Sequence, residues 1–247
     1  MKAFRTMLKT ELKLSLRGMD MFIFAICLPV VMMVILGILY GDAPAYAGAN
    51  HTFLQQSFPA ISTIAICAGG VMGLPLVVSD YRHRKILKRL RVTPAGPVLI
   101  LMVQAVIYAL YAAVSLILVY LTAAVFFGVS FTGSVPLFLL YYVLVMLSMF
   151  SIGMMVGGIA PNSKMAGLIA SLLYFPMLIF SGATLPYEAM PAALQHIADA
   201  LPLTQGIKLL KAACLDLPTG DVILPILIMA ALTVVCAGIS IRFFRWE

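Results

Sequence analysis

The sequence predicts an all-α integral membrane protein with six transmembrane helices, an N-terminal amphipathic helix at the membrane surface, and an outer helical hairpin between the fifth and sixth spans. Of its 247 residues, 63% are hydrophobic and 10% are charged, whereas soluble domains average about 45–50% apolar and about 25% charged residues. The charged residues are clustered, and long uncharged runs separate the clusters. These observations exclude a soluble globular domain and a disordered chain. We expect residues 1–247 to form one transmembrane domain.

Five uncharged runs are long enough to cross a bilayer, which requires about 20 mostly apolar residues per helix. The longest run, Val92–Ser163, can hold two helices because the turn-forming stretch Gly128–Pro136 divides it. These runs are continuously apolar and do not alternate with polar residues, which disfavours transmembrane β-strands. Kinks are expected where prolines interrupt the first two spans, at Pro29, Pro59 and Pro75. The predicted spans are residues 21–40, 57–79, 98–127, 136–158, 165–180 and 222–241.

The basic residues indicate the orientation of these spans. They concentrate in the N-terminal segment, in the loop after the second span, at Lys164 and in the C-terminal tail, whereas the opposite side carries only Lys208 and Lys211. Basic loops favour the cytoplasm, so we expect both termini to be cytoplasmic and the chain to lie in the cytoplasmic membrane. This topology explains the net charge of +7, and nucleic-acid binding is not expected.

Residues 1–18 carry the pattern of a basic amphipathic helix. Apolar residues share one arc of a helical wheel, and basic residues spaced mostly four apart occupy the opposite arc. Such a helix lies flat at the cytoplasmic interface and contacts anionic membrane lipids; a simple positive-inside anchor is the alternative. The candidate residues of this interfacial helix are Phe4, Arg5, Leu8, Lys9, Leu12, Lys13, Leu16 and Arg17.

The cytoplasmic segment 80–96 combines many basic residues with a short apolar stripe. Ile86, Leu87 and Leu90 follow a helical spacing, and Pro94 ends any helix. A short cytoplasmic helix with an apolar stripe binds either a protein partner or the membrane surface. The residues by themselves leave both readings open.

The outer segment 181–221 is the only long stretch between spans. Pro191 and Pro202 bracket one helical pattern, and a second apolar face continues from Leu203 towards Cys214. Two short helices with apolar faces beside a membrane predict a hairpin that dips partly into the outer leaflet. An ordinary structured loop is the alternative.

The same residues narrow the class of function. The chain has no G-x-x-x-x-G-K-[ST] phosphate-binding loop, so we do not expect it to hydrolyse ATP. No ionisable residue lies at the centre of a span, which disfavours an intramembrane catalytic pair or ion relay and favours an amphipathic or lipid-like cargo. No cysteine or histidine spacing suggests a metal site. We therefore expect a transport subunit and not an enzyme. Candidate residues of the substrate path are Ser62, Thr63, Tyr174 and Phe175.

In the order and placement of its motifs, the chain resembles the permease subunits of type-2 ABC transporters, which include bacterial drug-resistance and polysaccharide exporters. The resemblance covers essentially the whole chain. Many members place a Glu-rich, Gly-containing stretch before the Leu-x-x-Thr-Pro element, whereas here Asp80 stands among arginines and lysines. The matching motifs are Leu90-Arg91-Val92-Thr93-Pro94 after the second span, Phe180-Ser181-Gly182, Leu185-Pro186 and Met190-Pro191 after the fifth, and Pro202-Leu203-Thr204.

The resemblance implies half of an ATP-driven exporter of the bacterial cytoplasmic membrane. A second permease copy would complete the path, as a homodimer or a heterodimer, and cytoplasmic ATP-binding cassette subunits would bind ATP and Mg. This chain would carry no cofactor of its own. An ion-coupled secondary carrier or a channel is the alternative.

The resemblance also implies roles for the segments outside the spans. Segment 80–96 would be the coupling helix that docks on the ATPase, with Leu87 and Leu90 packing there, and the N-terminal helix would ride on the ATPase. Coupling would use Arg84, Lys85, Leu87, Lys88, Arg89, Leu90, Thr93 and Pro94. Segment 181–221 would gate the exit, through Ser181, Gly182, Pro186, Glu188 and Pro191.

Overall fold

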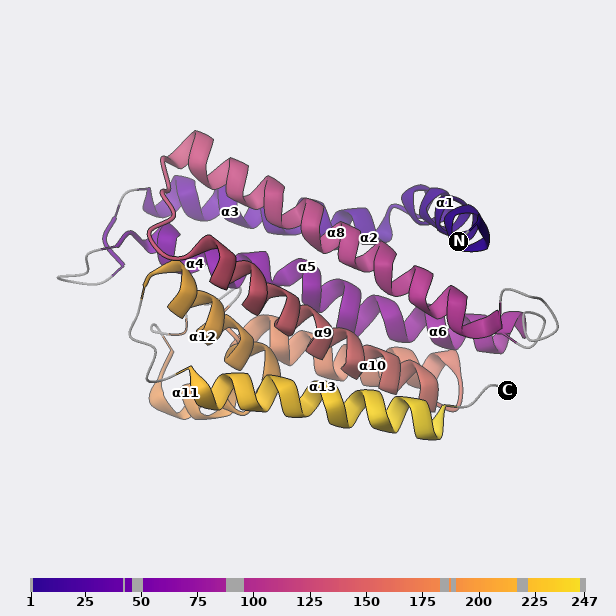
Figure 1. Ribbon diagram of the computed structural model, residues 1–247. Coiled ribbons are helices and arrows are strands. Elements are labelled where there is room, and N and C mark those ends of the chain that lie inside the picture. The colour runs from indigo at the N-terminus through magenta and orange to yellow at the C-terminus, as the bar shows by residue number, and fades with distance from the viewer. Residues whose placement is uncertain are drawn as a thin grey trace.

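The computed structural model describes residues 2–41, 43–45, 51–87, 96–182, 187, 190–216 and 222–244. Apart from one isolated β-bridge between Pro44 and Thr52, the regular elements of these residues are helices. Figure 1 shows the long helices side by side in a bundle. The N-terminal helix and the last turn of the C-terminal helix lie at one end of the bundle, and two short helices lie at the other.

Six helical stretches of the described residues are long and apolar enough to cross a membrane. They confirm the predicted all-α membrane fold, and their bounds match the predicted spans to within a few residues. The spans are Ile23–Tyr40, Phe53–His83, Val98–Phe127, Val135–Ile159, Ser163–Phe180 and Ile223–Phe243.

The first two spans are composite, whereas the other four are single helices. An amphipathic helix, α1 (Lys2–Arg17), precedes them, and α11 (Ala192–Asp199) and α12 (Pro202–Cys214) lie between the fifth and sixth spans. The single-helix spans are α8 (Gly96–Phe127), α9 (Val135–Ile159), α10 (Ser163–Phe180) and α13 (Ile223–Phe243). The first span joins α2 (Asp20–Phe22), the π-helix η1 (Ile23–Cys27) and α3 (Leu28–Tyr40), and the second joins α4 (Phe53–Ser62), α5 (Ile64–Cys67), the π-helix η2 (Ala68–Gly73) and α6 (Leu74–His83).

The prolines explain where the composite spans change their helical register. Each π-helix ends two residues before a proline, Pro29 or Pro75. Proline has no N–H to donate to the carbonyl four residues earlier, so the preceding turn widens. In the second span the α-helix is also interrupted at Thr63, four residues after Pro59. The three predicted kink positions thus coincide with irregularities of the backbone.

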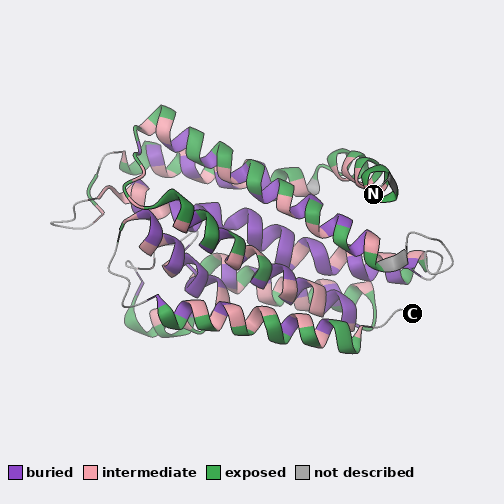
Figure 2. Cartoon of the chain, viewed as in Figure 1, coloured by how far each residue is buried: buried purple, intermediate pink, exposed green. Residues whose placement is uncertain are grey.

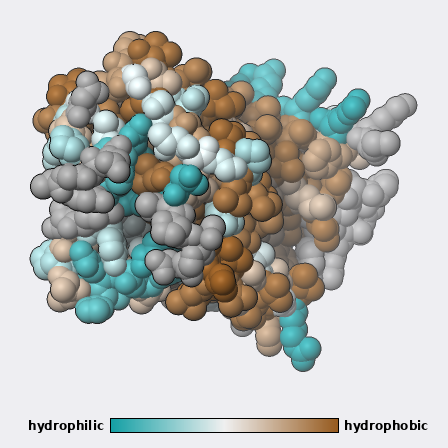
Figure 3. Space-filling model, turned by 60° about the vertical axis from the view of Figure 1, so that its left-hand side comes forward, coloured by the Kyte–Doolittle hydropathy of each residue, from teal (hydrophilic) through white to brown (hydrophobic). Residues whose placement is uncertain are grey.

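The second span forms the centre of the bundle, since 83% of its most apolar stretch is buried (Figure 2). Its π-helix packs directly on α9, where a Cβ atom added to Gly153 would collide with the carbonyl oxygen of Gly70. Small residues allow membrane helices to approach this closely. The other spans surround this pair and expose apolar side chains outward. In Figure 3 these side chains cover the middle of the visible face, and hydrophilic groups gather towards its ends.

The predicted helical patterns of the outer segment are present as α11 and α12. Helix α12 is wedged among the spans, and its Leu203, Leu209 and Leu210 side chains are fully buried. Gly206 faces Val145 of α9 at a distance that leaves no room for a side chain. Helix α12 is therefore part of the core at this end of the bundle, whereas most of α11 is exposed or partly exposed.

Candidate functional site

Helix α1 presents its two faces largely as its sequence predicts. Phe4, Leu8 and Leu12 are partly buried against the core of the bundle, whereas Arg5, Lys9, Lys13 and Arg17 are exposed. Leu16 departs from the prediction, because its side chain is 52% exposed. Ser15 faces the bundle instead, and its hydroxyl lies 3.1 Å from the hydroxyl of Tyr111 in α8.

A polar cluster that sequence reasoning missed joins α1 to two spans. The Tyr81 hydroxyl of α6 donates to Glu11 Oε2 of α1 at 2.5 Å. Gln104 Nε2 of α8 donates to the same Glu11 oxygen at 2.9 Å and to the Tyr81 hydroxyl at 2.8 Å. The sequence did contain a signal for this cluster, because Glu11 is the only acidic residue in a helix with five basic ones.

The predicted coupling residues fall into three groups. Arg84 and Lys85 are exposed, and Arg84 Nε pairs with Asp80 Oδ1 at 2.9 Å. Leu87 is 1% exposed and packs with Val78, Ile100 and Leu101 of its own chain. Leu87 therefore packs within its own chain in this structure, and its packing on a partner stays a prediction. The remaining predicted residues lie outside the described residues: Lys88, Arg89, Leu90, Thr93 and Pro94.

Arg82, counted above only as a basic loop residue, is 6% exposed. Its guanidinium donates to the carbonyl oxygens of Gly158, at 2.9 Å, and Ala160. These carbonyls end α9, where the last turn of a helix lacks intrahelical donors. Arg82 thus fastens the end of the second span to the end of the fourth.

The four candidate residues of the substrate path do not lie together. Ser62 and Thr63 are fully buried, and their hydroxyls donate to the carbonyls of Pro59 and Ala60, both at 2.7 Å. Serine and threonine commonly satisfy their hydroxyls in this way inside a helix. Neither residue lines the two cavities described below. For these two residues, the expectation of a path-lining role is not supported.

Tyr174 and Phe175, in contrast, line a cavity of about 330 Å³. Its walls are almost wholly apolar and come from both π-helices, from α8 and from α10. Tyr174 is 4% exposed, and its buried hydroxyl has no hydrogen-bond partner among the described residues. The chemistry of its walls therefore suits the cavity to apolar groups.

A second cavity, of about 230 Å³, adjoins the first and shares Met21, Val77 and Tyr108 with it. Its wall includes Glu11 and Gln104 of the polar cluster. The two cavities are therefore neighbours, and the smaller one lies against α1.

At the opposite end, Ser181 and Gly182 are buried, and Gly182 has a φ of 92°, which favours glycine. Pro191 is exposed and precedes the first turn of α11. The predicted gate residues Pro186 and Glu188 lie outside the described residues. The Ser181 hydroxyl has no partner among the described residues.

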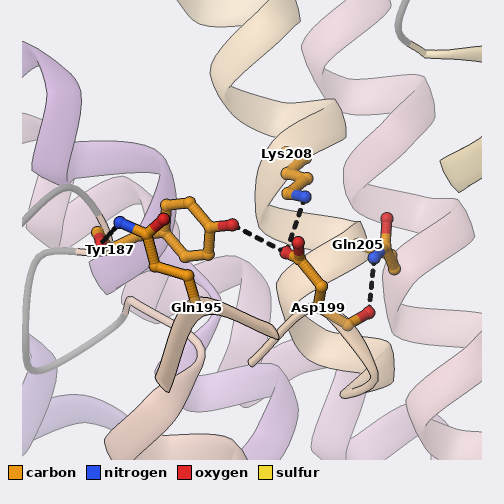
Figure 4. A network of polar contacts seen from close by, with 5 residues as sticks. All are labelled: Tyr187, Gln195, Asp199, Gln205 and Lys208. Carbon is orange, nitrogen blue, oxygen red and sulfur yellow. Dashed lines mark hydrogen bonds and ion pairs between the residues drawn. The ribbon is translucent and has the colours of Figure 1, made fainter. Parts of the chain in front are cut away.

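A network around Asp199 ties α11 to α12 at this end (Figure 4). Lys208 Nζ and the Tyr187 hydroxyl both donate to Asp199 Oδ1, at 2.7 and 2.9 Å. Gln205 donates to the Asp199 carbonyl oxygen at 2.6 Å, and Gln195 to that of Tyr187 at 3.1 Å. Desolvation of Asp199 raises the pKa of its carboxyl group, but the bonds from Lys208 and Tyr187 and the nearby positive charge outweigh it and hold the pKa below its ordinary value.

Comparison with known proteins places this geometry in context. Residues 2–215 match the family model described as ABC-2 type transporter. The chain is 36% identical over 85 residues to the inner membrane transport permease YhhJ of Escherichia coli (strain K12), which covers 34% of this chain and 23% of that protein. It is 35% identical over 95 residues to Nodulation protein J of Rhizobium leguminosarum bv. viciae, which covers 38% of this chain and 37% of that protein. The chain thus matches well under half the length of either relative.

Proposed function

Since the chain belongs to the ABC-2 type transporter family, we propose that this transmembrane permease is half of an ATP-driven exporter, paired with a second permease copy and with separate ATP-binding subunits. The partner subunits would bind ATP and Mg and hydrolyse the nucleotide. The observation that best supports this proposal is the Glu11–Tyr81–Gln104 cluster. It joins α1 to α6 and α8, the helices at the two ends of the predicted coupling segment 80–96.

We assign this end of the bundle to the cytoplasm. The exposed basic residues of α1, together with Arg84 and Lys85, lie at this end, as does Arg242 in the last turn of α13 (Figure 1). A basic surface favours the cytoplasmic side of a membrane. Helices α11 and α12 would then face the exterior, where the Asp199 network braces the exit.

The proposed transmission begins when the ATP-binding subunits close and push on segment 80–96. Because Tyr81 lies at the start of this segment, Gln104 lies in the helix that follows it, and both bond to Glu11, α1, α6 and α8 would shift as a unit. The π-helices η1 and η2 form part of the wall of the larger cavity. Displacement of the helix ends would therefore change the shape of the chamber that holds Tyr174 and Phe175.

Co-purification tests this proposal. The tagged permease and a candidate ATP-binding cassette protein from the same genome are expressed together, extracted in mild detergent and purified through the permease tag. We expect a stable complex that hydrolyses ATP, and weakened association after the double charge reversal Arg84→Glu and Lys85→Glu. Lys164→Glu is the matched control, because Lys164 is also exposed and on the proposed cytoplasmic side. A correctly inserted permease that binds no ATP-binding subunit would refute the assignment.

A further inference from the structure

The two adjoining cavities differ sharply in chemical character. The larger one is lined mainly by apolar side chains, including Phe24, Met72 and Leu76. The smaller one is mixed, because Glu11, Tyr81 and Gln104 contribute to its wall together with apolar side chains such as Leu14 and Met21. Because Met21, Val77 and Tyr108 line both cavities, the two lie next to each other, and an elongated molecule that bridges them would place an apolar part in one and a polar part in the other.

The apolar chamber has the features of a ligand site. Its volume of about 330 Å³ falls within the range of small-molecule pockets. Methionine side chains such as Met21 and Met72 adapt to ligands of different shape, and π-helical segments recur at functional sites. The aromatic side chains of Tyr174 and Phe175 form part of its wall.

Glu11 places a carboxylate in the wall of the smaller cavity. The hydrogen bonds from Tyr81 and Gln104 reach the same oxygen of Glu11, Oε2. In the part of the chain that the structure describes, the acidic residues that form ion pairs are Asp80 and Asp199. Glu11 pairs with no lysine or arginine of these residues. The tyrosines Tyr81 and Tyr108 line the same chamber, and aromatic faces attract cations. The chain as a whole has a net charge of +7, whereas the charge of the Glu11 carboxylate in this cavity is negative.

We propose that the two neighbouring cavities together bind a hydrophobic organic cation, such as a quaternary ammonium or phosphonium compound with an aryl or alkyl body. The cationic centre lies beside Glu11, and the apolar body extends past Tyr108 into the chamber of Tyr174. This assignment deepens the proposed function by naming its class of cargo, and it rests on that function for the step of transport. Binding itself requires neither ATP nor the partner subunits.

Equilibrium binding of two ions of matched shape tests the charge preference. The full-length permease is placed in lipid nanodiscs, and binding of tetraphenylphosphonium and of tetraphenylborate is measured after subtraction of binding to empty discs. We expect saturable binding of the cation and none of the anion. Equal binding of both ions, or of neither, overturns the proposal and indicates a cavity filled by ordinary lipid.

Glu11→Gln separates cation binding from a purely structural role. The glutamine oxygen can still accept the bonds from Tyr81 and Gln104, whereas the charge is lost. We expect at least a tenfold weaker affinity for tetraphenylphosphonium with an unchanged melting temperature. Asp216→Asn, which neutralises an exposed carboxylate at the other end of the bundle, is the control and leaves affinity unchanged. Unchanged affinity in Glu11→Gln contradicts the proposal.

A second variant keeps the test decisive if Glu11→Gln does not fold. Leu76→Trp fills the larger cavity from its wall and is expected to abolish saturable cation binding; full retention of binding would overturn the assignment of the apolar chamber. Association with the ATP-binding subunit is measured on the same preparations. Loss of that association refutes the exporter assignment, whereas absence of cation binding in an intact complex refutes only the choice of cargo.

Discussion

The hydroxyl of Tyr81 donates a 2.5 Å hydrogen bond to the carboxylate of Glu11, although the two residues are 70 positions apart in the chain. The bond connects a helix that is outside the six spans to the end of the most buried span. Gln104 closes the triangle from α8. Three elements that meet at the proposed cytoplasmic end are thereby held by one carboxylate oxygen.

Removing the Tyr81 hydroxyl should uncouple this end of the bundle. Tyr81→Phe deletes the donor to Glu11 and leaves the carboxylate with a single partner. Hydrogen bonds to charged groups contribute about 1.5–3 kcal/mol, so we expect a clear fall in melting temperature and a several-fold loss of cargo-stimulated ATP hydrolysis. Tyr120→Phe is the control, because Tyr120 is exposed on α8. Equal ATPase stimulation in both variants would contradict a coupling role.

Substitution of Arg82, even by lysine, should lower the stability of the folded protein. Its planar guanidinium reaches two carbonyl oxygens at the end of α9, and a lysine cannot reproduce that fork. We expect Arg82→Lys to lower the free energy of unfolding by about 1–3 kcal/mol, since a buried acceptor is left unsatisfied. Arg84→Lys should change it by less than about 1 kcal/mol, because the Arg84–Asp80 pair is exposed. Thermal unfolding in detergent measures both, and equal shifts would be inconsistent with this reading.

The close packing of the second and fourth spans predicts a strong effect at one glycine. A methyl group at Gly153 would collide with the Gly70 carbonyl oxygen, so the helices must separate. Overpacking of this kind costs about 1–3 kcal/mol or more, and we expect Gly153→Ala to reduce both the yield of folded protein and its melting temperature. Gly238→Ala in α13 meets no atom within 4 Å and should be neutral. Comparable losses in both variants would argue against helix contact as the cause.

The outer network predicts a small dependence of stability on pH. The pKa of Asp199 is lower in the folded protein than its ordinary value of 3.8. The stabilisation is therefore complete above about pH 4 and is lost as the pH falls below 3.8 and through the folded pKa. Its size should stay below about 1 kcal/mol, because both side chains of the Lys208–Asp199 pair are more than one-third exposed. Melting curves of the protein and of Asp199→Asn should converge at low pH; a constant difference would exclude this origin.

Cysteine labelling tests the proposed orientation, because the native Cys214 should not react with the label. Cys214 is 4% exposed and burial raises the pKa of its thiol to about 12, so it should not react with an impermeant maleimide at neutral pH. Ala193→Cys places an exposed thiol on α11 and should be labelled in intact cells. Arg84→Cys should be labelled only after the membrane is permeabilised. The reverse result would invert the topology.

Local pattern was sufficient for most of the secondary structure. The fourth span was predicted at 136–158 and is Val135–Ile159, because a turn-rich loop marks one of its ends and the apolar run is continuous. The second span begins at Phe53 and not at residue 57. The cause is a reciprocal cap between Thr52 and Gln55, which starts the helix before its most apolar part. Capping of this kind can be read from the sequence.

Composition and periodicity by themselves determined that this chain crosses a membrane six times and carries an amphipathic helix at its start. These properties depend on neighbouring residues and on transfer into lipid. Only the tertiary structure decided that Leu87 packs inward, that Ser62 and Thr63 bond to their own helix, and that Glu11 meets Tyr81. Such contacts join residues far apart in the sequence, and they depend on how the helices rotate and approach when they pack.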